Sequence, residues 1–140
     1  MPFGTWETLT FVAGLRCDEM TAPLVIDGAM NGETFLAYIE QGLAPTLNRG
    51  DIVVMDNLRA HKVAGIKEAI EAVAADLRYL PEYSPDLNPI EMSFSKLKAY
   101  LRKAAERTQR SLRRRIGFFV PRLGADECAN YFAHAGYVSI

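Results

Sequence analysis

The sequence contains few of the residues that bind zinc or form disulfides. Its 140 residues include two cysteines, Cys17 and Cys128, which lie far apart and lack the close spacing of zinc ligands. A disulfide framework is also excluded as the basis of the fold, because small disulfide-stabilised domains contain several cysteine pairs. We expect both cysteines to be ordinary buried thiols.

Long apolar runs are missing as well. Stretches such as Ile52–Met55 are far shorter than the roughly 18 residues that a membrane-spanning helix needs. The first four residues, Met-Pro-Phe-Gly, do not have the charged and apolar pattern of a cleavable leader. Because 49% of the residues are hydrophobic, the chain can still form a core. We therefore expect a compact, soluble, cytoplasmic domain that has no membrane partner.

Acidic and basic residues are separated along the chain, although the net charge is only -1. Residues 1–91 contain 14 acidic and 6 basic side chains, whereas residues 92–122 contain 10 basic side chains and one acidic one. Such a basic segment is typical of phosphate binding, and a solvated helix face is an equally open alternative. We divide the chain into an acidic, sheet-bearing part (1–91), a basic helical segment (92–122) and a C-terminal helix with its tail (123–140).

The spacing of apolar residues predicts an α/β fold. Alternation over residues 8–15 and the apolar run 24–26 predict two strands that form a hairpin, and Asn31 is a good N-cap for a helix over 32–43. The run Ile52–Met55 predicts a central strand buried on both faces, connected by a helix over 62–75 to a parallel strand at 77–80. A helix that starts near residue 90 carries the basic residues to about residue 115, and a last short helix spans 125–134.

Two carboxylates stand where such a fold places ligands. Asp56 ends the predicted central strand, at the edge where ligands collect in open α/β sheets, and Glu91 begins the next long helix. A pair of carboxylates on rigid elements suits Mg²⁺. Both residues also have a structural interpretation: Asn88, Pro89 and Glu91 match a capping box, which the spacing alone favours, and Asp56 could end a turn. We do not expect Asp86, in the preceding turn, to be catalytic.

These residues belong to a larger pattern. Asp56-Asn57 at the end of a strand, then His61, then the string LPEYSPDLNPIE (residues 80–91) resemble the catalytic core of bacterial insertion-sequence transposases related to mariner elements, which are DDE superfamily endonucleases. The resemblance runs from the strand near Trp6 to the segment CANYF (residues 128–132). It implies an α/β, RNase H-like mixed sheet flanked by helices. The family's first strand would precede Trp6, so the resemblance implies that this chain lacks the first strand.

The resemblance also implies a chemistry. In this family three acidic residues bind two Mg²⁺ or Mn²⁺ ions, which activate water or a DNA 3′-hydroxyl for attack on a phosphodiester. Asp56 matches the second acid and Glu91 the third, as catalytic residues and metal ligands. Asn57 and His61 match supporting positions around that site, although a structural role is slightly favoured for His61. The first acid would lie upstream of this chain, and Asp27 is the only conceivable substitute within it.

DNA is the implied substrate, both as element ends and as target. The resemblance implies that the helix-turn-helix region that reads DNA sequence in this family lies outside this chain, so we expect contacts to phosphates from the basic segment. The candidates are Lys96, Lys98, Arg102, Lys103, Arg113, Arg114 and Arg115. Such contacts give salt-sensitive affinity that is independent of sequence. Another transposase chain, or the missing N-terminal part, is the expected protein partner.

We hypothesise that the chain is the C-terminal part of a transposase catalytic domain for Mg²⁺-dependent strand cleavage and transfer in DNA transposition and recombination. It would be inactive alone because the first aspartate is missing. The alternative is a non-catalytic remnant that binds DNA or forms dimers, and so inhibits full-length transposase. An RNase H-type nuclease unrelated to transposition ranks last, because this hypothesis does not explain the presence of the string YSPDLNPIE.

Overall fold

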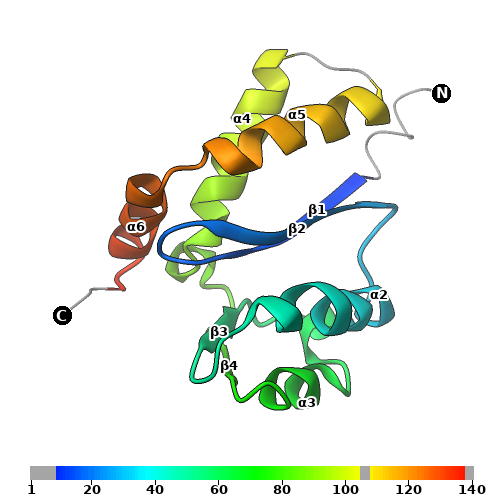
Figure 1. Cartoon of the computed structure of the whole chain (residues 1–140), viewed down its shortest axis with the longest axis vertical. Helices are drawn as coiled ribbons and strands as arrows, with labels where there is room; N and C mark the ends of the chain where they lie inside the picture. Colours follow the sequence, from blue (N-terminus) through cyan, green and yellow to red (C-terminus); the bar gives the residue numbers. More distant parts are fainter. Residues whose placement is uncertain (1–8, 105–107, 138–140) are drawn as a thin grey trace. The chain divides into compact units, whose positions relative to one another are not determined.

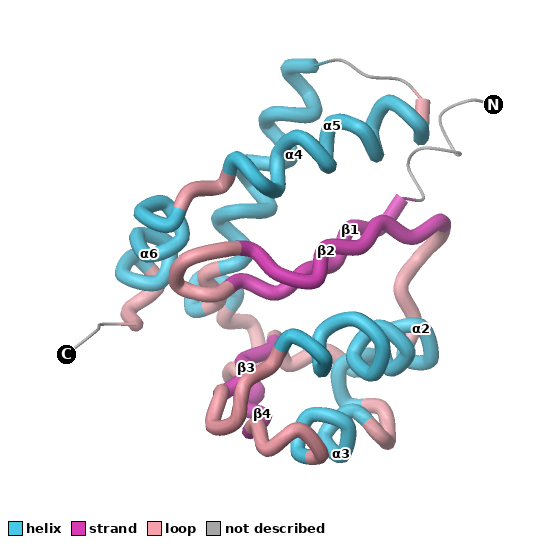
Figure 2. The backbone as a smooth tube through the Cα atoms, in the orientation of Figure 1, coloured by secondary structure: helices cyan, strands magenta, loops and turns pink. Residues whose placement is uncertain are grey.

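The computed structural model describes residues 9–104 and 108–137. The chain divides into two compact units, which we treat separately. The hairpin unit comprises residues up to Ala29 and from Pro89 onward, and the central unit comprises Met30–Asn88. Five α-helices and four strands occur in the described ranges (Figures 1 and 2). No helix in these ranges is long and apolar enough to cross a membrane.

The hairpin unit begins with two antiparallel strands, as the sequence predicts. Strand β1 (Leu9–Leu15) pairs with β2 (Met20–Asp27), from Leu9 opposite Asp27 to Leu15 opposite Met20, with an irregularity between Val12 and Gly14. The turn is closed by the Arg16 N–H, which donates to the Glu19 carbonyl at 2.8 Å. Cys17 lies exposed in this turn, so the expectation of a buried thiol is wrong for Cys17 and right for Cys128.

Three helices complete the hairpin unit: α4 (Ile90–Ala104), α5 (Gln109–Arg122) and α6 (Ala125–His134). The basic segment therefore forms two helices, where the apolar spacing predicts one that ends near residue 115. The second begins at Thr108, whose side chain accepts a hydrogen bond from the Ser111 N–H at 3.0 Å, as an N-cap does. Helix α6 has the bounds that the sequence predicts.

The core of the hairpin unit joins the hairpin to all three helices. Its buried members come from β2, α4, α5, the segment that follows α5, and α6: Met20, Leu97, Ile116, Phe119, Leu123 and Cys128. Phe11 of β1 meets Phe94 of α4 edge to face, with ring centroids 5.8 Å apart. Figure 1 shows the hairpin lying alongside α4 and α5. The basic helices are thus fixed by their apolar faces.

The central unit starts with α2 (Gly32–Tyr38), followed by a π-helical turn η1 (Ile39–Leu43) and a 3₁₀ turn η2 (Ala44–Thr46). The expected N-cap is confirmed, since the Asn31 side chain accepts from the Thr34 N–H at 2.8 Å. The predicted helix over 32–43 is helical throughout, but its last turn widens.

A strand–helix–strand segment follows. Strand β3 (Ile52–Met55) pairs in parallel with β4 (Asp76–Tyr79), through a 3₁₀ turn η3 (Arg59–Lys62) and the short helix α3 (Ile66–Glu71). The helix predicted over 62–75 is shorter because Gly65, with φ +100°, breaks the helical path just before it. A further 3₁₀ turn, η4 (Pro85–Leu87), lies in the proline-rich loop, which is otherwise irregular as expected.

The strands do not form one mixed sheet in the described residues. They form two sheets of two strands each, β1–β2 and β3–β4. Ile52 of β3 is 61% exposed, so this strand is not buried on both faces as its apolar run predicts. The core of the central unit lies instead where α3 packs on η1 and β4, with Ile39, Ile66 and Ile70 fully buried.

Shortening Ile70 tests this core. We expect Ile70→Ala to lower the free energy of unfolding by about 2–5 kcal/mol, because it removes buried methyl groups and leaves a cavity. The matched change Ile52→Ala, at an exposed position, should alter it by less than about 0.5 kcal/mol. Urea unfolding of both variants measures the difference. Equal losses would contradict this location of the core.

Candidate functional site

Asp56 directly follows β3, at the carboxyl end of the parallel pair. Its side chain is half-buried, and its Oδ1 accepts a hydrogen bond from Nδ2 of Asn88 at 3.1 Å. Asn88 itself is buried, with 9% of its surface exposed. One carboxylate oxygen of Asp56 is therefore held by a residue from the other end of the central unit.

His61 holds the backbone of Asp56 and not its carboxylate. The His61 Nδ1 lies 2.9 Å from the Asp56 carbonyl oxygen, which it bonds in the tautomer with a proton on Nδ1. The imidazole ring stacks on Phe35, with centroids 4.5 Å apart and planes 27° apart. The Tyr79 hydroxyl donates to the His61 carbonyl oxygen at 2.5 Å. His61 therefore connects the end of β3 to α2 and β4.

Asn57 supplies an oxygen that lacks a partner. Its side-chain Oδ1 is buried and makes no hydrogen bond within the described part of the chain. Buried oxygens in proteins normally have a partner, so this one is open to a donor or a cation. Carboxylate and amide oxygens are the ligands of hard cations, and the donors at Asp56 and Asn57 fit Mg²⁺ or Mn²⁺ in kind. The described residues contain no group of three or more Asp, Glu, His or Cys side chains that could hold a metal.

Glu91 belongs to the hairpin unit, where it is the second residue of α4. It is half-buried, and it lies in the first turn, where the helix dipole stabilises a negative charge. Ser93 and Ser95 hydroxyls donate to the carbonyls of Ile90 and Glu91, at 2.6 and 3.1 Å. Both hydroxyls are thus engaged with the backbone of the first turns of α4.

Two of the predicted DNA-binding residues are engaged within the hairpin unit. The Lys96 ammonium donates to Oε2 of Glu127 in α6, and the Tyr131 hydroxyl donates to the same oxygen at 2.9 Å. The hydrogen bond from Lys96 lowers the pKa of the Glu127 carboxyl, while burial and the bond to Glu127 raise the pKa of Tyr131. Lys96 therefore joins α4 to α6.

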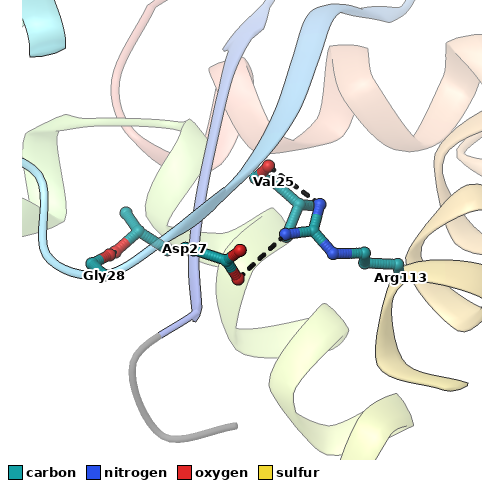
Figure 3. Close-up of polar contacts among 5 residues, drawn as sticks. Val25, Asp27, Gly28 and Arg113 are labelled. Carbon is teal, nitrogen blue, oxygen red and sulfur yellow. Dashed lines mark hydrogen bonds and ion pairs between the residues drawn. The ribbon is translucent and has the colours of Figure 1, made fainter. Parts of the chain in front are cut away.

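Arg113 has a similar role on the other side of the hairpin. Its guanidinium donates to the Val25 carbonyl and to Oδ1 of Asp27, each at 3.1 Å (Figure 3). Asp27 is the residue that the sequence offers as a substitute for the first acid of the family. In the structure its carboxylate forms an ion pair that fastens α5 to β2.

The other basic candidates differ in their surroundings. Lys98, Arg102, Lys103 and Arg114 are exposed and make no hydrogen bond or ion pair with another described residue, whereas Arg115 is half-buried and has a contact. Lys98 and Arg102 stand four positions apart on α4, so they share one face of the helix. These four exposed side chains, Lys98, Arg102, Lys103 and Arg114, are called the open basic residues below.

Sequence reasoning missed the contact of Asn88 with Asp56. It assigned Asn88 to the start of the helix, since a contact between positions 56 and 88 leaves no trace in local spacing. One signal pointed to Asn88 all the same. It lies within the string YSPDLNPIE, whereas a capping box would involve only residues 88–91 of that string.

The ion pair of Lys96 can be tested by pH. Because the folded-state pKa of Glu127 is lowered from its ordinary 4.5, the pair stabilises the fold above that pH, and the effect is lost as the pH falls through the lowered value. We expect Lys96→Met to return the Glu127 pKa toward 4.5 and to flatten this part of the stability profile. Lys98→Met, at an open basic residue, should leave both unchanged. Carboxyl NMR titration measures the pKa, and a Glu127 that titrates identically in Lys96→Met would refute the pairing.

The comparisons with known proteins show a family and a fold. Residues 2–113 match the DDE superfamily endonucleases. The fold is similar to a solved structure described as the catalytic domain of Mos1 mariner transposase, with a TM-score of 0.67 and 12% sequence identity, over 91% of this chain and 76% of that one. This likeness confirms the expected RNase H-like α/β fold. No curated protein matches the chain. Because the match spans most of the sequence, this chain belongs to the DDE superfamily endonucleases.

Proposed function

We propose that the chain is a catalytic-domain fragment of a DNA transposase, inactive alone, in which Asp56 and Glu91 bind divalent cations that serve the cleavage and joining of DNA strands. The observation that carries this proposal is the position of Asp56: it follows a parallel strand, and its carboxylate is held by Asn88 of the string that ends in Glu91. Membership of the DDE superfamily endonucleases supports phosphodiester chemistry.

The chain's own residues have distinct tasks in this proposal. Asp56 and Glu91 provide carboxylate oxygens, and the Oδ1 of Asn57, which has no hydrogen bond within the described residues, adds a neutral oxygen next to Asp56 in the chain. His61 holds the backbone to which Asp56 belongs. When bound, a pair of Mg²⁺ or Mn²⁺ ions would stabilise the charge on the attacking and leaving oxygens of the phosphodiester. The open basic residues would contact DNA phosphates at element ends or target.

Iron can report the cation site without any DNA cleavage. Fe²⁺ can occupy oxygen sites of this kind. The bound Fe²⁺ reduces added peroxide to hydroxyl radicals, which cut the nearby backbone, and ascorbate regenerates Fe²⁺. We expect the chain to be cut near residues 56 and 91, and Asp56→Asn to suppress both cuts because both acids hold the same cations. Fragment masses locate the cuts.

The control for this experiment is Asp86→Asn, which removes a carboxylate from the same proline-rich loop. Asp86 is exposed, and we assign it no cation. Its substitution should leave the cuts unchanged. Cuts that persist in Asp56→Asn, or that appear at residue 56 without residue 91, would overturn the shared site.

A second candidate function is DNA binding without catalysis, in which the chain inhibits a full-length transposase. It is favoured by the open basic residues, which have no described partner and so are available for phosphate. Lys96 and Arg113 are weaker candidates for this purpose, since each is already paired with a carboxylate.

Charge reversal measures this binding. We expect Lys98→Glu/Arg102→Glu to weaken binding to a DNA duplex at least tenfold at about 0.1 M salt and to reduce the slope of log affinity against log salt by about two. The matched pair Arg49→Glu/Lys67→Glu makes the same charge change on exposed residues of the central unit and should have little effect. Binding affected equally by both pairs would exclude a specific basic face.

Glu91→Gln distinguishes the two functions. If the chain is a catalytic-domain fragment, this variant binds DNA normally but loses the iron-dependent cuts. If the chain acts only by binding DNA, the wild type already lacks those cuts.

A further inference from the structure

We propose that Asn88 is a positioning residue, whose side-chain amide fixes the orientation of the Asp56 carboxylate. The inference rests on the proposed function, because the orientation matters for the cation that Asp56 is proposed to bind. Asn88 would not touch the cation or the DNA. It would act through Asp56.

The contact has the properties of a firm hydrogen bond. Nδ2 of Asn88 lies 3.1 Å from Oδ1 of Asp56, across 32 positions of sequence. Asn88 is buried, and Asp56 is half-buried. A hydrogen bond to a charged acceptor is stronger than one between neutral groups. Burial strengthens it further, because few water molecules compete for the donor and the acceptor. The bond can therefore restrict the rotation of the Asp56 side chain.

The backbone of Asn88 is itself held in place. Its N–H donates to the Pro85 carbonyl at 3.0 Å, which closes the 3₁₀ turn η4. Pro89 follows directly, and a proline restricts the backbone of the residue before it to extended conformations; Asn88 has φ -104° and ψ 109°. A side chain on so restricted a backbone has few orientations from which to reach Asp56.

The chemistry also explains why this residue is asparagine. A residue at the start of a helix needs only a side-chain oxygen, which Ser, Thr and Asp provide as well. The contact with Asp56 needs a donor, and an aspartate here would instead place a second negative charge about 3 Å from the first. Asparagine has the size of aspartate and supplies the amide donor that the Asp56 carboxylate accepts.

Two residues thus hold different atoms of Asp56. His61 bonds the backbone oxygen, and Asn88 bonds a carboxylate oxygen. With the backbone fixed by one contact and the side chain by the other, the carboxylate has one defined direction. Residues that orient metal ligands in this way commonly change metal affinity by 10–100-fold when they are mutated.

The first test measures the Asp56 side chain directly, with no metal present. Three-bond NMR couplings report whether its χ1 angle has one value or averages over several. We expect one rotamer in the wild-type chain. Asn88→Asp keeps the size of the side chain but replaces the donor with an acceptor, and Asn88→Ala removes the donor without adding a charge, so both should show averaging.

Asn130 provides the matched control. It lies exposed on α6, so Asn130→Asp and Asn130→Ala make the same chemical changes away from Asp56, and the Asp56 couplings should not move. Thermal unfolding shows that the variants are folded. A single rotamer that survives in both Asn88 variants, or averaging already in the wild type, would overturn the inference.

The second test connects the orientation to the cation. Mn²⁺ binding to the whole chain, measured by calorimetry, should be abolished at this site by Asp56→Asn and weakened about tenfold by Asn88→Ala. If Asp56→Asn has no effect, the proposed cation site is wrong, and the couplings still decide whether Asn88 orients Asp56. If Asp56→Asn weakens binding but Asn88→Ala does not, the cation site stands and the positioning role is overturned.

Discussion

The parallel pairing of β3 with β4 is the constraint on which the candidate site depends. Parallel strands need a crossover between them, here supplied by η3 and α3, and their carboxyl ends then meet at one edge. The Leu80 N–H donates to the Met55 carbonyl at 2.8 Å and so extends the pairing to that edge. Asp56 and the start of the proline-rich loop therefore leave the sheet side by side. An antiparallel pairing would place the loop at the opposite end.

Charge in this chain serves two purposes that composition does not separate. The basic segment carries most of the Lys and Arg residues, yet Lys96 and Arg113 are paired with Glu127 and Asp27 and join elements of the hairpin unit. Exposed ion pairs of this kind contribute little free energy each, but they reduce the availability of the side chain for phosphate. The remaining open basic residues are the ones for which the electrostatic argument for DNA applies.

Local patterns in the sequence predicted the elements well, and failed where the outcome depends on distant contacts. Alternation predicted the hairpin, the cap at Asn31 was visible because it acts over three residues, and α6 has the predicted bounds. The break between α4 and α5 was missed, although residues 106–111 include no apolar side chain and Thr108 is a good N-cap. The exposure of Ile52 was missed for another reason: an apolar run does not tell how many neighbours a strand has.

The same distinction applies to the candidate site. The position of Asp56 at the carboxyl end of β3 could be predicted, because an apolar run followed by a carboxylate is a local signal. The contact of Asn88 with Asp56 could not, since it depends on how the chain returns to the end of β3 after 32 positions. The pairing of Asp27 with Arg113 was equally invisible, because the partners are 86 positions apart.

The string YSPDLNPIE also restricts the backbone of the loop that it forms. Pro85 and Pro89 restrict the backbone at two points, and Tyr83, 97% exposed with φ +57°, adopts a left-handed conformation that costs about 1 kcal/mol or more. Such strain persists only where the surrounding structure imposes it. Here the restricted backbone leads into the turn that carries Asn88 to Asp56, and α4 begins two residues later with Glu91 in its first turn. In the proposed function, the string therefore links Asn88, which orients the Asp56 carboxylate, to Glu91, which supplies a further carboxylate.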